Sequence, residues 1–351
     1  MNRNSCIKEY TKLLIPLMIE ELYELLREKK KRVWTRKWIA RRSEFGASST
    51  LFRELQWELL RMDVEHFNAL LESVTPMIQK ENTVMRQAIP ARIKLQVALT
   101  YIATGLSYRY LQAFYRISRA AISLLLPEVM DAIYVYLKDY VKGTNSVVLM
   151  AVVDHDYCFR YVNIGANGRN SDSGIFRNSA LYSDLENNML PTGGFLVGDV
   201  AFALKRYLLK PYSGTNLTRV QKIFNYRLSR SRRIVENAFG ILTSRFRIFQ
   251  KPIPTDVNTT NNIIRASCAL HNWLRLTSPS CYFPKDCVDV EDIDSGTIVE
   301  GTWGRELIAT LPSITDHTTN NSPRIARNLR DKYAEYFSGA GAVVWQDRMI
   351  S

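Results

Sequence analysis

The sequence predicts a mixed α/β protein in which a helical N-terminal region precedes a few strands and further long helices. Two changes in the spacing and type of the apolar residues along the chain support this prediction. Apolar residues recur at three- and four-residue spacing over residues 51–80 and 90–140, as they do in amphipathic helices. From Ser146 the chain becomes rich in β-branched and aromatic residues, and a helical period returns after residue 217.

Composition limits the classes of protein that the chain can belong to. With 351 residues, of which 46% are hydrophobic, it is long enough for about two domains with a substantial core. The net charge of +13 favours a polyanionic partner such as nucleic acid, although an unspecialised basic protein has the same balance. Five cysteines without a CxxC pair, and four scattered histidines, argue against a disulfide framework or a zinc finger.

The first 50 residues form a basic segment. The apolar run near the start is interrupted by Glu20 and Glu21, so it predicts an amphipathic helix and no signal peptide or membrane span. The cluster Lys29–Arg32 has the composition of a nuclear import signal or a phosphate patch, but also of a solvated face. We expect an intracellular protein in the nucleus, with the cytoplasm as the alternative, and no membrane partner.

A helix, a short turn and a second helix are expected between residues 107 and 133. Ser107 and Ser118 each stand where a serine can cap a following helix. Arg116 and Arg119 lie where the second helix begins. This pattern is typical of a DNA-binding helix-turn-helix, and an ordinary helical hairpin shares it.

Three strands are expected after the helices. Residues 146–154 and 158–165 predict a hairpin around residues 155–157, and the stretch GGFLVGD, residues 193–199, predicts a short third strand.

The rest of the chain predicts helices around one loop. A helical period runs from Val220 to Phe246, with a break expected near residues 228–231 because two core slots hold Arg227 and Ser231. Residues 269–275 predict another helix, residues 276–320 a locally acidic loop, and the C-terminal stretch a last helix that stops at Gly339.

Two carboxylates stand out against their surroundings. Asp199 ends a strand of buried type, and Glu236 is the one acid among twelve Lys and Arg between residues 205 and 251. Glu236 can simply pair with Arg232 or Arg233 on the surface. Taken with Asp199, it can instead share a divalent Mg²⁺ or Mn²⁺, which prefer oxygen ligands. Carboxylates surrounded by basic residues suit a nuclease or transposase. The sequence contains no P-loop motif, which argues against a P-loop ATPase.

Several stretches resemble the PIF/Harbinger transposases and the nucleases derived from them. They are KGTNSVVLMAVVDHDYCFRYVNIGANGRNSDSGIF, GDVAFALKRYLLKPYSG, QKIFNYRLSRSRRIVENAFGILTSRFRIF and CALHNWLR, with WTRKWIARRS, FRELQ and the helix-turn-helix region upstream. The resemblance covers about residues 30–350, and its motifs are specific in combination.

The resemblance implies an RNase H-like DDE domain that cleaves and joins DNA with divalent metal. The second acid of the family falls on Asp199 and the third on Glu236, so both would be catalytic metal ligands. DNA is the implied substrate, and a Myb-like protein is a plausible partner. The expected DNA-binding residues are Arg116, Arg119, Lys205, Arg227, Arg230, Arg232 and Arg233.

The first acid of the family has no counterpart in this sequence. The family carries it in a motif like IDGKH before KGTNS, but here a helix runs almost directly into DYVKGTNS, and no IDG occurs. Asp154 is the one candidate replacement, although it falls on the next strand. The first strand of an RNase H-like sheet lies centrally, so its loss would leave residues 146–153 without a neighbour and expose strand edges.

Three interpretations of the whole chain follow. The first is a metal-dependent DNA endonuclease by descent, impaired by the loss of its first aspartate. The alternative is a non-catalytic DNA-binding or chromatin-associated remnant of a transposase, and a third is an incomplete gene prediction or splice form. The expected domains are a basic segment (1–50), a helical domain (51–140), an incomplete RNase H-like DDE domain (141–275), and an acidic loop with a final helix (276–351).

Overall fold

A computed structural model describes most of the chain in two compact units. The described residues are 39, 41–50, 59–83, 87–166, 172–191, 193–284, 287–292, 297–299, 301 and 323–350. The first unit spans residues 1–55 and 106–124, and the second spans residues 56–105 and 125–351. The predictions for the N-terminal amphipathic helix and the Lys29–Arg32 cluster lie outside the described residues, and the four domain boundaries stay predictions.

The described part of the first unit is helical. It holds α3 (Arg42–Phe45), α4 (Ala47–Thr50), α8 (Tyr108–Tyr115) and the start of α9 (Arg119–Leu137), and α4 contacts α8. Ser107 is the N-cap residue of α8, but its side chain makes no capping hydrogen bond. The Ser118 hydroxyl accepts a hydrogen bond from the Ala121 N–H at 3.3 Å. The helix, turn and helix therefore form at the expected residues, and DNA binding by this motif stays a prediction.

Two helices open the second unit. In α6 (Val64–Ile78), Asp63 caps the first turn by accepting the His66 N–H at 2.9 Å. α7 (Ala91–Thr104) is buried along almost its whole length and ends at Gly105, which has a left-handed φ of 62°. The Lys94 ammonium is buried at the α6–α7 contact, where it donates to the Ile78 carbonyl and lies 3.3 Å from Glu128.

The predicted hairpin forms as β1 (Lys142–Val153) and β2 (Phe159–Ala166), paired antiparallel. β1 follows the 3₁₀ turn η1 (Lys138–Tyr140) directly, at the point where the resemblance leads us to expect one more strand. Two short helices, α10 (Asp172–Arg177) and α11 (Ala180–Glu186), follow the hairpin. Phe176 and Leu181 of these helices pack with Met150 and Val152 of β1 in one apolar cluster.

The third predicted strand forms as β3 (Leu196–Val197), and its partner was not predicted. It pairs in parallel with β4 (Leu208–Leu209). The described strands make three separate two-stranded sheets, β1–β2, β3–β4 and β5 (Val290–Glu291)–β6 (Ile298–Val299). The RNase H-like sheet and the absence of its first strand therefore stay predictions.

A single helix, α12 (Arg219–Arg245), follows β4, and the break predicted near residues 228–231 is wrong. A capping box of Thr218 and Gln221 starts the helix. The two polar residues that suggested a break, Arg227 and Ser231, have partners that let the helix continue. Arg227 lies over the Phe337 ring at 5.1 Å, and the Ser231 hydroxyl donates back to the Arg227 carbonyl at 3.1 Å.

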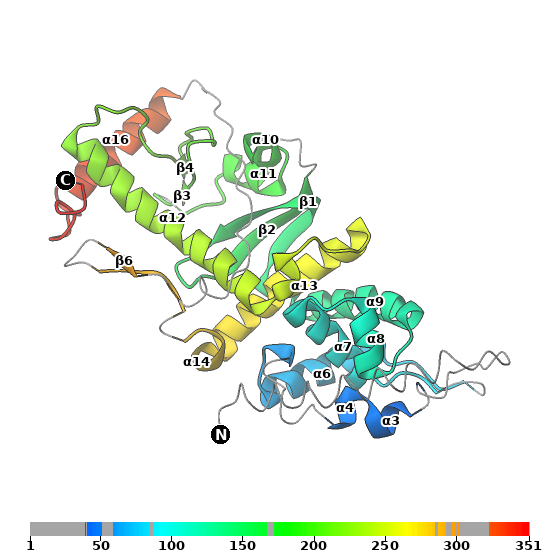
Figure 1. Ribbon diagram of the computed structural model, residues 1–351. Coiled ribbons are helices and arrows are strands. Elements are labelled where there is room, and N and C mark those ends of the chain that lie inside the picture. The colour runs from blue at the N-terminus through cyan, green and yellow to red at the C-terminus, as the bar shows by residue number, and fades with distance from the viewer. Residues whose placement is uncertain are drawn as a thin grey trace. The chain divides into compact units, whose positions relative to one another are not determined.

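The helix α13 (Val257–Thr277) includes and extends the one predicted over residues 269–275, and it contacts β2 (Figure 1). Asn272 joins the helix to the sheet. Its side-chain oxygen accepts the Phe159 N–H at 2.8 Å, and its amide donates to the carbonyls of Phe159 and Tyr140 at 2.8 and 2.6 Å. Asn272 therefore occupies the edge of β2 at Phe159 as a neighbouring strand would.

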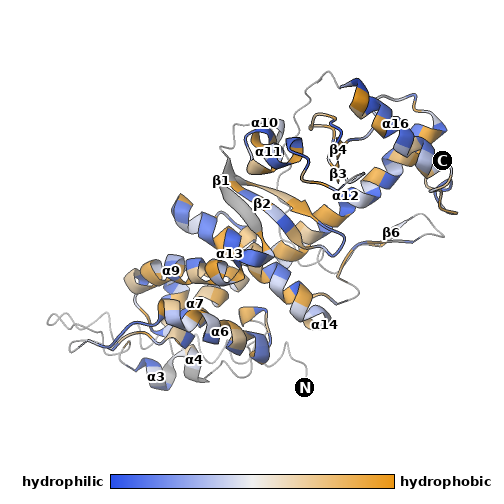
Figure 2. Cartoon of the chain, turned by 180° about the vertical axis from the view of Figure 1, so that it is seen from behind, coloured by the Kyte–Doolittle hydropathy of each residue, from blue (hydrophilic) through white to orange (hydrophobic). Residues whose placement is uncertain are grey.

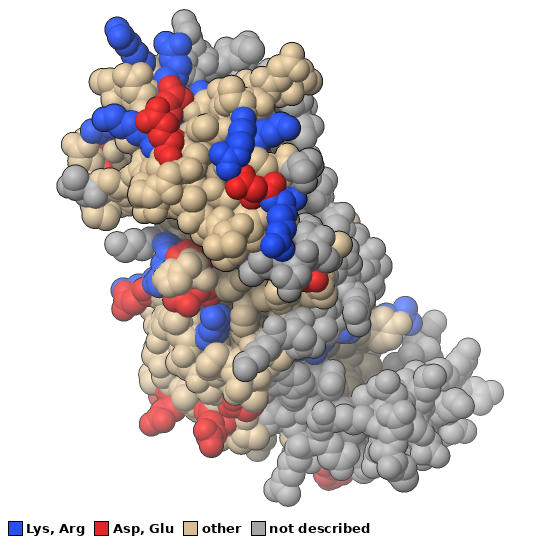
Figure 3. Space-filling model, turned by 90° about the vertical axis from the view of Figure 1, so that its left-hand side faces the viewer, with Lys and Arg blue, Asp and Glu red and all other residues tan. Residues whose placement is uncertain are grey.

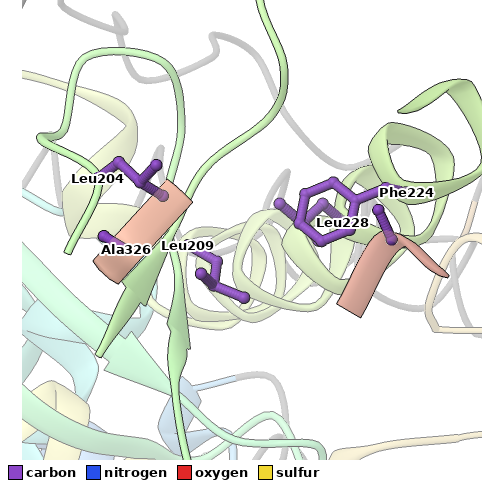
Figure 4. Packing of buried hydrophobic residues seen from close by; sticks show 6 residues of the cluster. Leu204, Leu209, Phe224, Leu228 and Ala326 are labelled. Carbon is purple, nitrogen blue, oxygen red and sulfur yellow. The ribbon is translucent and has the colours of Figure 1, made fainter. Parts of the chain in front are cut away.

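The predicted acidic loop contains the short helix α14 (Pro279–Tyr282) and the β5–β6 pair, and the predicted last helix is α16 (Arg324–Ser338). α16 lies along α12 (Figure 1). Leu204, Leu209, Phe224, Leu228 and Ala326 form the shared core of this region (Figure 4). Apolar and polar colours alternate along α16 in Figure 2, as expected for a helix with one buried face.

The mixed α/β class is confirmed, with a helical N-terminal region ahead of the strands. Among the described residues, one helical stretch, Arg119–Tyr140, is long and apolar enough to cross a membrane. This is weak evidence for a span, because core helices of soluble proteins share the same length and composition.

Candidate functional site

Asp199 lies in a tight turn directly after β3. Its Oδ1 accepts the Ala201 N–H at 2.9 Å, which fixes the carboxylate within the turn. Gly198 is buried just before it, where an added Cβ would lie 3.1 Å from Phe202 and 3.3 Å from Leu208. A side chain at 198 would therefore be crowded by Phe202 and Leu208, which favours glycine at this position.

One cation lies close to this turn. The Lys210 ammonium donates to the carbonyl of Val200, the residue after Asp199, at 3.2 Å. Burial and the neighbouring Arg330 guanidinium lower the pKa of Lys210, and the Asp199 carboxylate opposes them. A lysine therefore borders the predicted metal ligand, and an arginine lies near that lysine.

Glu236 lies on the surface of α12. Its side chain is 61% exposed and lies 3.8 Å from Arg232, four residues earlier. A pair of this kind contributes only about 0.3–0.5 kcal/mol in water. The next residue, Asn237, is buried and accepts the Asp289 N–H at 3.3 Å, which joins the β5–β6 segment to α12 beside Glu236.

Asp154 organises the turn of the β1–β2 hairpin. Its Oδ1 accepts the N–H groups of Asp156 and Cys158, both at 3.0 Å, and its other oxygen pairs with Arg160. Its oxygens are therefore already occupied by backbone and guanidinium donors, which disfavours a metal ligand. One carboxylate oxygen or ring nitrogen from each of Asp154, His155 and Asp156 lies within 4.8 Å of the others, and His155 is largely exposed.

The donor chemistry of Asp199 and Glu236 fits a divalent cation better than that of Asp154. Among the described residues, Asp199 uses one oxygen in its turn, and Glu236 has only a loose ion pair. Both offer the oxygen ligands that Mg²⁺ and Mn²⁺ prefer. No described hydrogen bond or ion pair joins the two, so their shared site stays a prediction.

Lys205, a predicted DNA contact, has an ion-pair partner within the protein. Its ammonium lies 2.9 Å from Glu186, whose Oε1 also accepts the Tyr207 hydroxyl at 2.8 Å. These bonds lower the pKa of Glu186 to about 2 and raise the pKa of Lys205. Lys205 therefore anchors the segment after Asp199 to α11, and a phosphate would have to compete with Glu186 for it.

The C-terminal residues contact several basic side chains of α12. Arg227 lies over Phe337, Arg230 lies 5.5 Å from the Trp345 ring centroid, and Arg219 pairs with Asp347 at 2.5 Å. Figure 3 shows Lys and Arg side chains, with acidic ones between them, on the upper part of the face that Figure 1 presents on its left, where α12 and α16 lie. Arg232 and Arg233, farther along α12, are half-buried.

The two predicted DNA contacts of the first unit differ in exposure. Arg116 ends α8 in a left-handed conformation with a φ of 54° and is only 8% exposed. Arg119, the first residue of α9, is exposed. Arg119 is therefore the more accessible to a phosphate, and both assignments stay predictions.

Comparison with known proteins identifies the segment that carries these acids. Residues 134–272 match the family model described as DDE superfamily endonuclease. This segment belongs to that superfamily. The DDE segment runs from α9 into α13 and contains Asp154, Asp199 and Glu236.

Two curated relatives support the predicted Harbinger descent. The chain is 32% identical over 140 residues to "Protein ALP1-like" of Arabidopsis thaliana, an alignment that covers 36% of this chain. It is 28% identical over 156 residues to "Putative nuclease HARBI1" of Mus musculus, across 41% of this chain. The alignments span 34% and 44% of the relatives' own lengths. No solved structure matches.

Sequence reasoning missed Lys210 as a neighbour of Asp199 and Arg330 as a neighbour of Lys210. Lys210 follows the unpredicted strand β4, and Arg330 lies on α16, outside the DDE segment. The run LLKPY after the Asp199 motif contained a signal, because two apolar residues before a lysine and a proline suit a short buried strand.

Proposed function

We propose that this chain is a DNA-binding protein derived from a divalent-metal-dependent DNA endonuclease, with cleavage impaired by the loss of the first catalytic aspartate. The observation that carries the proposal is the DDE superfamily match over residues 134–272. Asp199 and Glu236 remain in that segment, and the candidate third acid, Asp154, is engaged by Arg160.

Each retained acid has a defined role in this proposal. Asp199 and Glu236 would hold a Mg²⁺ or Mn²⁺ ion, which supplies Lewis-acid chemistry to an attacking water and to the leaving oxygen. Asp199 is held in place by its turn, because the Ala201 N–H binds its Oδ1. A site of this kind normally uses three acids, so two ligands hold the cation weakly and the cleavage rate falls.

DNA binding rests on charge and depends on salt. The net charge of +13 supplies a sequence-independent attraction to the phosphate backbone. Candidate contacts are Arg116, Arg119, Lys205, Arg227, Arg230, Arg232 and Arg233. We also propose a nuclear location and a Myb-like partner protein, as the resemblance implies.

Binding and cleavage can be measured on the same full-length protein. Fluorescence anisotropy of a labelled duplex across a KCl series gives the affinity, and nicking of supercoiled plasmid with MgCl₂, MnCl₂ or EDTA gives the cleavage. We expect binding that weakens by about 0.9 log units per tenfold rise in salt for each phosphate contacted. We expect nicking close to the EDTA background in the wild type.

Variants separate the impaired nuclease from the non-catalytic remnant. Residual metal-dependent nicking that disappears in D199N and E236Q, but not in the surface control E335Q, supports the proposed metal ligands. Nicking absent from every protein, with DNA binding intact, favours the non-catalytic remnant. Rapid metal-dependent nicking by the wild type contradicts the impairment, and a wild type that does not bind DNA at low salt contradicts both interpretations.

A further inference from the structure

Two cations from separate parts of the chain contact the Asp199 turn and the segment that follows β4. The Lys210 ammonium donates to the carbonyl of Val200 at 3.2 Å. A guanidinium nitrogen of Arg330 donates to the carbonyl of Pro211 at 3.4 Å. Because Val200 follows Asp199, the first bond places the Lys210 ammonium beside the predicted metal ligand. Because Pro211 follows Lys210, the second bond places the Arg330 guanidinium beside the segment that carries Lys210.

The surrounding core fixes this arrangement. Leu209, the last residue of β4, and Ala326 of α16 belong to the same buried cluster (Figure 4). Lys210 follows Leu209 directly, and Arg330 lies one helical turn after Ala326 on the same side of α16. The two cations are therefore held near each other by rigid elements, not by long mobile loops.

Arg330 is oriented before any ligand arrives. Its guanidinium carbon lies 3.8 Å from the centroid of the Tyr212 ring, which is a close cation–π contact. The adjacent carboxylate, Asp331, already accepts the Tyr212 hydroxyl at 2.6 Å. Stacking and the Pro211 bond restrict the rotamers of Arg330, so it loses little entropy when it binds an anion.

Two like charges held together repel, and an anion between them removes that repulsion. Resting on the proposed function, we infer that Lys210 and Arg330 form a phosphate-binding subsite beside Asp199 that holds a phosphodiester of the bound DNA. Arginine and lysine are the residues that suit phosphate oxygens.

The subsite extends the functional unit beyond the DDE segment. Lys210 lies within residues 134–272, whereas Arg330 lies on α16, outside them. α16 therefore contributes a DNA contact as well as packing surface. Because the contact is to a phosphate, it affects affinity for all DNA sequences alike.

The test is the salt dependence of DNA affinity for K210A, K210R and R330A in the full-length protein, measured by anisotropy with one labelled duplex in magnesium-containing buffer. The matched control is K332A, since Lys332 is exposed on α16 about 200° around the helix from Arg330. We expect K210A and R330A each to lower the slope of log affinity against log salt by about 1. We expect K210R to keep the wild-type slope and K332A to leave it unchanged.

The outcomes separate the subsite from the proposed function. Wild-type binding with unchanged slopes in K210A and R330A overturns the subsite alone, as does an equal loss in K332A. A wild type that does not bind the duplex overturns the proposed function and the subsite with it. Thermal unfolding of each variant is recorded in parallel, and if R330A unfolds, K210A against K210R decides the question.

Discussion

The junction of β2 with α13 and the turn after β3 use motif residues in different ways. At the junction, His271 and Asn272 are fully enclosed, and their polar atoms bond to backbone groups and to Tyr282. At the turn, Asp199 is half-buried and uses one oxygen for its own loop. Polar residues that bond wholly within the protein hold the fold together, and those with spare oxygens at the surface are the candidates for chemistry.

The largest expected effect is at Asn272. N272A leaves the N–H and C=O of Phe159 and the C=O of Tyr140 without the partners they have now. Because each unsatisfied buried group costs about 1–3 kcal/mol, the free energy of unfolding should fall by about 3 to 5 kcal/mol in urea titration. N258A, at an exposed position of the same helix, is the control, and an equal loss there would contradict the assigned role.

His271 should make stability depend on pH. Its Nε2 donates to the Tyr157 carbonyl at 2.9 Å, so its Nδ1 accepts from the Tyr282 hydroxyl at 3.0 Å, which fixes the neutral form. Burial lowers the pKa of His271 to about 4 from its ordinary 6.5.

The unfolded chain binds this proton first as pH falls, so stability is present above pH 6.5 and is lost between about 6.5 and 4, by about 3 kcal/mol at most. Urea titrations across this range should reveal the loss in the wild type. H271Q, although less stable, should lack this part of the pH dependence, and an equal dependence in both proteins would rule out His271 as its source.

An intermediate effect is expected where α16 meets α12. Phe337 is partly buried against Phe224 and lies beneath the Arg227 guanidinium. F337A should lower stability by about 2 kcal/mol, less than a full core truncation because the site is partly open. Hydrogen exchange should quicken in α16 before it quickens in α13. Y336A, at an exposed neighbouring ring, tests whether any aromatic loss on this helix has the same effect.

The smallest effect on stability is expected at Glu236. E236Q removes an exposed pair with Arg232, so the free energy of unfolding should change by less than about 0.5 kcal/mol. A larger loss in urea titration would mean that Glu236 is structural, and its role would then resemble that of Asn272. A stable E236Q protein is also what makes this variant usable in the nicking assay.

The helices and strands that were predicted correctly are those whose formation depends on nearby residues in the sequence. The β1–β2 hairpin, α6, α7 and α16 lie where periodicity and caps placed them, because amphipathic patterns report which face of an element is buried. The predicted break in α12 was wrong because Arg227 and Ser231 are satisfied by Phe337 and by the helix backbone. The first of these contacts comes from residues more than a hundred positions away, which a local pattern does not contain.

The acids of the candidate site could be predicted from the sequence, but the basic residues near them could not. Asp199 and Glu236 stand out because each carboxylate contrasts with the residues around it. Lys210 and Arg330 do not stand out in a chain with 47 Lys and Arg. Their importance depends on where β4 and α16 meet, and Asp154 likewise shows its pairing with Arg160 only once the hairpin is formed.

The contact of α16 with the β3 region bears on how this protein can be produced. The Tyr333 hydroxyl donates to the Gly193 carbonyl at 2.8 Å, and the Tyr333 and Phe195 ring centroids lie 4.6 Å apart. A recombinant fragment cut to the DDE segment alone, residues 134–272, would lack α16 and its contacts with the β3 region. It would expose Leu204, Leu209 and Phe224 to solvent. Such a fragment would tend to aggregate, so expression should extend to residue 350.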